Sequence, residues 1–202
     1  MSLDEAEQGV RRRTGGRSAK VRVAVLQSTL QALAEHGYSG LTISEIARRS
    51  GVHATSIQRR WGSLENLLLE AVLGYSQQKL PIPNTGSLRG DLLAFGRSLN
   101  RYLATPVGET VLRTLAAAED NPTLAANRAQ IIKARYDATR VMAKRAAERG
   151  ELRPRVDPQI AVELLVAPLN LRKLTRQPID DKFIKILVDT LLHGLSGSHR
   201  TR

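Results

Sequence analysis

The fold is decided by residues 41–67, LTISEIARRSGVHATSIQRRWGSLENL, because this stretch encodes two short helices joined by a tight turn. Thr42 is placed to cap the first helix, and Glu45 lies where its side chain can reach back and complete a capping box. Gly51 can adopt the positive φ that a sharp helix exit needs. A second helix is expected over residues 53–60. This order predicts a helix-turn-helix.

The second helix of the pair is expected to bury Ile57 and to turn its polar side chains outward. Hydroxyl, amide and guanidinium groups bind phosphates and base edges. Glutamine can pair bidentately with adenine and arginine with guanine, so Gln58 and Arg59 are the candidates for reading sequence. The alternative is that both side chains touch only phosphate. The outward polar set is Thr55, Ser56, Gln58, Arg59 and Arg60.

Length and composition narrow the class of protein. The 202 residues, 42% of them hydrophobic, are enough for a globular core in one or two domains. A net charge of +12 favours an anionic partner, which is either nucleic acid or an acidic membrane surface. The longest apolar runs, such as residues 164–169, fall short of the roughly 18 residues that a membrane-spanning helix needs. We therefore expect no membrane partner.

Two further features bear on location and chemistry. The N-terminal MSLDEAEQ is polar and has no apolar core of the secretory kind, so the cytoplasm is the expected location. The chain has no cysteine, which excludes disulfides, thiolate metal sites and cysteine nucleophiles. The histidines show no metal-ligand spacing, and Gly37-Tyr38-Ser39-Gly40 is only a near miss for a serine nucleophile elbow. We therefore expect no enzyme, no catalytic residue, no metal site and no cofactor.

The rest of the chain predicts an all-α fold, since helix caps and breakers recur and sustained strand-like alternation does not. A polar arm is followed by a helix over residues 19–36. Another helix begins at the Ser63 cap, and the loop over residues 81–86 marks a domain boundary. Pro168 is expected to bend the helix that contains it. The later helices are expected to begin near Leu88, Pro106, Pro122, Pro158 and Asp180.

Residues 18–72 resemble the DNA-binding domain of the tetracycline-repressor (TetR) family, and the segments that carry the resemblance are EHGYSGLTISEIARRSGV and SIQRRWGSLENLL. Two later segments, RGELRPRVDPQIAVELLVAPL and QPIDDKFIKILVDTLLHGL, are similar to the regulatory domain of one large subgroup of that family. The resemblance implies a homodimer that places two recognition helices on a palindromic double-stranded DNA operator. It also implies a small-molecule effector in the larger domain, whose binding usually relieves repression.

With that resemblance, the chain divides into five predicted parts. They are a disordered basic arm over residues 1–17, a three-helix DNA-binding domain over 18–62, a connecting helix over 63–80, a ligand-binding and dimerisation domain over 81–195, and a disordered tail over 196–202. The arm and its flank carry Arg11, Arg12, Arg13, Arg17, Lys20 and Arg22. Such a segment fits a minor groove, and Arg17 is our candidate contact, although a solvated tail is the alternative.

The resemblance also implies particular site residues. Two positions depart from the family pattern, because Gln58 stands where tyrosine is common and Leu64 where lysine is common. Both of the usual residues bind phosphate, and Arg59, Arg60 and the arm are expected to compensate for them. The DNA-binding candidates are Thr42, Ser44, Ala54, Thr55, Ser56, Gln58, Arg59, Arg60 and Trp61, together with Arg17.

The last two helices are the candidate dimer interface, because their apolar faces are broader than a monomeric core needs. Packing within their own subunit is the alternative. The interface candidates are Leu164, Leu165, Pro168, Leu169, Phe183, Leu187, Val188 and Leu191. The candidate pocket residues, which could equally be ordinary core, are Leu99, Tyr102, Leu103, Leu112, Tyr136 and Met142.

Two functions of different class remain open from the sequence. The first is a sequence-specific transcriptional regulator, most often a repressor in such families, released from its operator by an effector. The second is a helical small-molecule-binding protein whose DNA binding is lost or non-specific, and Gln58 and Leu64 keep this alternative open. Specific binding requires one palindromic sequence to bind on the order of a thousandfold or more tighter than bulk DNA, so a titration separates the two functions.

Overall fold

The fold is built from helices alone in the part of the chain that the computed structural model describes, which is residues 15–117, 122–152 and 158–195. This confirms the all-α prediction. In chain order the helices are α1 (Gly15–His36), α2 (Ile43–Ser50), α3 (Ala54–Trp61), α4 (Leu64–Lys79), α5 (Leu88–Leu103), α6 (Pro106–Ala116), α7 (Pro122–Glu148), α8 (Pro158–Leu174) and α9 (Asp181–Leu195).

Local sequence explains where several of these helices begin. The hydroxyls of Thr42 and Ser63 accept hydrogen bonds from the backbone N–H groups of Glu45 and Asn66, which caps α2 and α4. Gly51 has φ +68° and ends α2, as predicted. The predicted reciprocal half of the α2 capping box is wrong, because the carboxylate of Glu45 instead accepts hydrogen bonds from two arginines that follow it on α2.

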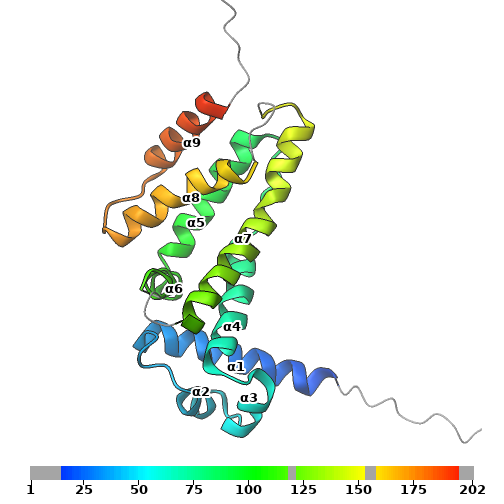
Figure 1. The fold of residues 1–202 in the computed structure, drawn as a ribbon, viewed down its shortest axis with the longest axis vertical. Coiled ribbons are helices and arrows are strands. Elements are labelled where there is room, and N and C mark those ends of the chain that lie inside the picture. The colour runs from blue at the N-terminus through cyan, green and yellow to red at the C-terminus, as the bar shows by residue number, and fades with distance from the viewer. Residues whose placement is uncertain (1–14, 118–121, 153–157, 196–202) are drawn as a thin grey trace, which may run out of the picture.

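Helices α1 to α4 form the head of the molecule (Figure 1). α1 packs on both α2 and α4, and Ile46, Ile57 and Leu67 are fully buried between them. α1 begins at Gly15, earlier than expected, so the end of the predicted disordered arm is helical. The remainder of that arm, residues 1–14, and the predicted tail, residues 196–202, lie outside the described residues.

The larger half is organised around α5, which packs against α8 and α9, while α7 packs against α8 and α4 (Figure 1). The two halves are not separate cores. Val111 of α6 and Leu124 and Ile131 of α7 belong to the same buried cluster as the head residues. Side chains on either side of the loop over residues 81–86 therefore share one packing unit. None of the described helices is both long and apolar enough to cross a membrane.

Candidate nucleic-acid interface and ligand cavity

The outer face of α3 carries the polar side chains that the sequence assigned to it. Ile57 is fully buried and anchors the helix on the head. On the opposite side, Thr55, Gln58 and Arg59 are exposed. The other DNA-binding candidates are also accessible, since Thr42, Ser44 and Arg60 are exposed and Ala54 and Ser56 are half-buried. α3 therefore presents hydroxyl, amide and guanidinium groups together on one exposed helix.

Trp61, the last residue of α3, is placed differently from the other candidates. Its side chain is buried, at 7% exposure, and its Nε1 donates a hydrogen bond of 2.7 Å to Oε2 of Glu70 on α4. The other carboxylate oxygen of Glu70 accepts from Arg22 of α1. Glu70 thus ties three helices of the head together. Trp61 fixes the base of α3, and its burial disfavours the predicted DNA contact. Arg22, in the flank of the predicted arm, is held within the head by Glu70.

The arginines of α2 are engaged within the head. Arg48 and Arg49 both donate to Glu45, and Arg49 also donates to Glu35 at 2.7 Å. These hydrogen bonds from Arg48 and Arg49 lower the pKa of the Glu45 carboxyl to about 2. The hydrogen bond to Glu35, followed by that to Glu45, raises the pKa of Arg49. These cations are partly neutralised where they stand, so they are poor candidates for binding phosphate.

The cations at the end of α3 are less constrained. Arg59 forms no ion pair within the described part of the chain. The guanidinium of Arg60 lies 5.2 Å from the centroid of the Trp61 ring and donates to Ser18 of α1 at 3.2 Å. A shallow groove lies between the start of α1 and α3, lined by Ser18, Val21, Gly51, Val52, His53, Ser56, Arg59, Arg60 and Trp61. This groove joins the first turns of α1 to the exposed face of α3.

The two departures from the family pattern occupy different environments. Gln58 is exposed on α3 and free to face DNA. Leu64, at the first position of α4, is half-buried and packs against the core of the head. A leucine here contributes apolar packing instead of a cation. Arg17 lies in the first turn of α1.

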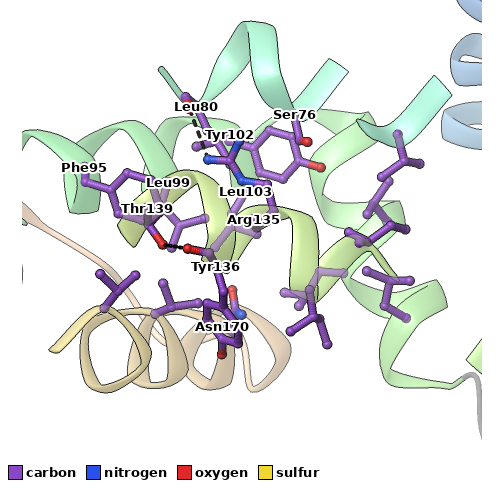
Figure 2. Close-up of a pocket in the computed structure, with 18 residues that line it drawn as sticks. Ser76, Leu80, Phe95, Leu99, Tyr102, Leu103, Arg135, Tyr136, Thr139 and Asn170 are labelled. Carbon is purple, nitrogen blue, oxygen red and sulfur yellow. Dashed lines mark hydrogen bonds between the residues drawn. The ribbon is translucent and has the colours of Figure 1, made fainter. Parts of the chain in front are cut away.

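A cavity of about 200 Å³ lies in the larger half, enclosed by α4, α5, α6, α7 and α8 (Figure 2). Its walls are mostly apolar. The pocket candidates that line it are Leu99, Tyr102, Leu103, Leu112 and Tyr136. Met142 does not line it, because its side chain is fully buried in the adjoining core. Sequence reasoning missed Arg135, Thr139 and Asn170, the polar lining residues of α7 and α8.

The predicted dimer residues divide between the inside and the outside of the subunit. Leu165, Leu169, Val188 and Leu191 are buried within the subunit, which favours the alternative that these four side chains pack inside it. Phe183, Leu187 and Pro168 are half-buried, and Leu164 is exposed. Four further apolar side chains that were not predicted are exposed on these helices: Ile160, Leu171 and Leu174 on α8, and Ile186 on α9.

On α8 the outward positions 160, 164, 167, 171 and 174 alternate steps of four and three residues. Such spacing places one stripe along a helix, the seam by which two helices pack together. Exposed apolar side chains in a continuous row are uncommon on a monomer. The outward face of α8 is therefore the part of this subunit best suited to a partner helix.

A helical head that presents α3, joined to a larger helical half with an internal cavity, defines a helix-turn-helix protein with a ligand-sized chamber. Comparison with known families agrees. Residues 25–71 match the family described as "Bacterial regulatory proteins, tetR family", and residues 82–191 match the "Tetracyclin repressor-like, C-terminal domain". The chain belongs to the TetR family. It is a DNA-binding transcriptional regulator and not an enzyme.

Individual relatives support the same assignment. The HTH-type transcriptional regulator AqdR of Rhodococcus erythropolis is 32% identical over 72% of this chain and 70% of its own length. The DNA-binding transcriptional repressor TetR of Mycobacteroides abscessus is 29% identical over 84% of this chain and 90% of its own length. The crystal structure of the TetR family transcription regulator SCO0332 superposes with a TM-score of 0.75 at 32% identity, over 87% of this chain and 98% of that one.

Proposed function

We propose that this protein is a homodimeric repressor in the cytoplasm that binds a palindromic DNA operator through α3 and releases it when a small molecule fills the cavity. The observation that carries the proposal is the exposed polar face of α3 on a buried apolar anchor. A relative that covers most of the chain is named as a DNA-binding repressor, which supports repression over activation.

We assign contacts on DNA from the environments of the side chains. Gln58 and Arg59 are exposed and unconstrained, which suits them to base edges. Arg60 is held over Trp61 and beside Ser18, which suits it to a fixed phosphate. Thr42, Ser44, Thr55 and Ser56 offer hydroxyls to the backbone on either side.

Two helices provide the physical link between the cavity and the head. Val111 of α6 lines the cavity and also packs in the core of the head, and α6 contacts α1. Val72 of α4 does the same, and α4 packs directly on α1. An effector that fits the cavity better when α4 and α6 are displaced would shift the head and favour the state that does not bind DNA.

The outward stripe of α8, with Ile186 of α9, is our proposed dimer face. Two such faces related by a two-fold axis would form a four-helix interface and bury the exposed apolar residues. Dimerisation would present two copies of α3, and a palindrome read by both requires half-sites one helical turn apart, about 34 Å.

Selection of bound sequences from a random DNA pool tests the function. We expect a palindrome with half-sites about one helical turn apart, bound on the order of a thousandfold or more tighter than random DNA. Equal affinity for all sequences would instead favour the alternative of a small-molecule-binding protein without specific DNA recognition.

A further inference from the structure

We propose that the cavity takes a small apolar molecule bearing a carboxylate, and that Arg135 binds the carboxylate. This inference rests on the proposed function, since it names the chemical class of the effector. Among the eighteen described residues that line the cavity, Arg135 is the only one with a charged side chain. Figure 2 shows it extending from α7 toward the end of α4, where a dashed line joins it to Leu80.

Among the described residues, no carboxylate forms an ion pair with the guanidinium of Arg135. Its Nη2 donates to the carbonyl oxygen of Leu80 at 3.0 Å, and none of the ion pairs among the described residues involves it. Arg145 of the same helix provides the contrast, because it is also partly buried but faces the carboxylate of Asp91 at 4.0 Å. A half-buried cation without a carboxylate beside it carries a desolvation cost, which an anionic ligand would offset.

The hydrogen bond to Leu80 gives Arg135 a structural role as well. Leu80 follows the last turn of α4, where a positive charge is favourable. This contact with the Leu80 carbonyl uses only one N–H group of the guanidinium, and it does not account for the position of Arg135 in the cavity wall. Burial lowers the pKa of Arg135, yet an arginine keeps its charge at neutral pH, and its remaining donors are available to a ligand.

Other polar groups can complete a carboxylate site. The Tyr102 side chain is 7% exposed, and its hydroxyl has no hydrogen-bond partner within the described residues. Burial raises the pKa of this hydroxyl, so it stays protonated and can donate. Asn170 of α8 lines the same cavity, and its amide can donate too.

Size and polarity limit the rest of the ligand. A cavity of about 150 Å³ in another protein holds benzene, so the 200 Å³ here accommodates a ring or short chain together with a carboxylate. The remaining wall is built mainly from leucine, valine, isoleucine and phenylalanine side chains. Such a wall favours an apolar body and offers little to a sugar or a polyamine.

Binding to the full-length free protein tests the inference by isothermal titration calorimetry. The probes are phenylacetate and octanoate, each compared with its neutral amide, phenylacetamide and octanamide. We expect each carboxylate to bind about tenfold to a hundredfold tighter than its amide, because a charge-assisted hydrogen bond distinguishes them. Acetate, which has no apolar body, is expected to bind far more weakly than either acid.

Arg135→Gln should remove the preference for the acid, since glutamine can still donate to Leu80 but carries no charge. Arg140→Gln is the matched control, because Arg140 is exposed on the same helix and the change in net charge is the same. It should leave the preference intact. Should Arg135→Gln fail to fold, which its melting curve would reveal, the comparison of acid with amide on the unaltered protein still decides.

Three results overturn the inference: equal affinity for acid and amide, an acid preference that survives Arg135→Gln, or no binding of either acid at millimolar concentration. The DNA selection is an independent measurement. Selective DNA binding without acid binding would remove this inference and leave the proposed regulator standing. Acid binding without selective DNA binding would do the reverse.

Discussion

At the scale of single residues, the two arginines that precede Trp61 differ in what holds them. Arg60 is fixed between the indole of Trp61 and the hydroxyl of Ser18. Arg59 has no such restraint within the described residues. A pre-positioned guanidinium suits a phosphate, whose place along the duplex does not depend on sequence. An unrestrained guanidinium can adjust its position to hydrogen-bond the edge of a particular base.

Arg60→Ala is therefore expected to weaken binding to all duplexes about equally. It should also reduce the slope of log affinity against log salt by about one unit, because one fewer phosphate is neutralised. Titrations of operator and random DNA over a range of salt concentrations measure both quantities. Arg48→Ala is the control, because Arg48 is exposed but already paired with Glu45 at 2.7 Å, and it should change the slope less. An unchanged slope for Arg60→Ala would remove this phosphate contact.

At the scale of elements, the turn between α2 and α3 depends on the backbone conformation of Gly51. Its φ of +68° lies in the left-handed region, and a Cβ there would meet nothing within 4 Å. Any cost of a side chain at this position is therefore conformational and not steric. Gly74, on the exposed side of α4, also has open space around it but has ordinary helical backbone.

These two glycines give a matched pair of predictions. Gly51→Ala should lower the free energy of unfolding by about 1 kcal/mol, because alanine is strained at positive φ. Gly74→Ala should raise it by about 1 kcal/mol, because alanine loses less backbone entropy in a helix. Urea unfolding followed by circular dichroism measures both. A similar sign for the two changes would show that the turn does not hold Gly51 in its left-handed conformation.

The same helices show which features local sequence predicts and which it does not. The α2 turn and the start of α4 were predictable, because Thr42, Gly51 and Ser63 each determine a local hydrogen bond or dihedral angle. The hydrogen-bond partners of the Glu45 carboxylate were not predictable, because they depend on how the side chains of two arginines pack against it. The burial of Trp61 was likewise not predictable, because its partner Glu70 lies on the next helix.

The dimer face and the cavity of the larger half were less predictable from sequence. α8 is apolar on several faces, with Leu165 buried and Leu164 exposed, so periodicity alone could not say which stripe packs within the subunit. In the sequence, Arg135 is one of several cations between residues 133 and 149, a pattern typical of a solvated helix face. Only the packing of α4 against α7 shows that it lines a cavity.

At the scale of the whole molecule, the proposed function requires that two heads be held at a fixed distance. The cavity and the head share α4 and α6, whereas α8, which carries the outward stripe, belongs to the larger half, away from the head (Figure 1). A dimer joined through α8 and α9 would hold the larger halves together. Movements of α4 and α6 would then change the separation of the two α3 helices without breaking the dimer.

Leu164→Glu tests this arrangement. The side chain is 46% exposed in the single subunit, so glutamate costs the monomer little, but two copies at a two-fold interface would bury their charges. We expect a folded monomer by analytical ultracentrifugation and a large loss of affinity for the palindrome. Val23→Glu is the control, because Val23 is 48% exposed on α1 of the head and should leave the dimer intact. If Leu164→Glu sediments as the unaltered protein does, the subunits meet elsewhere, and the coupling through α4 and α6 would have to act on a different pair of surfaces.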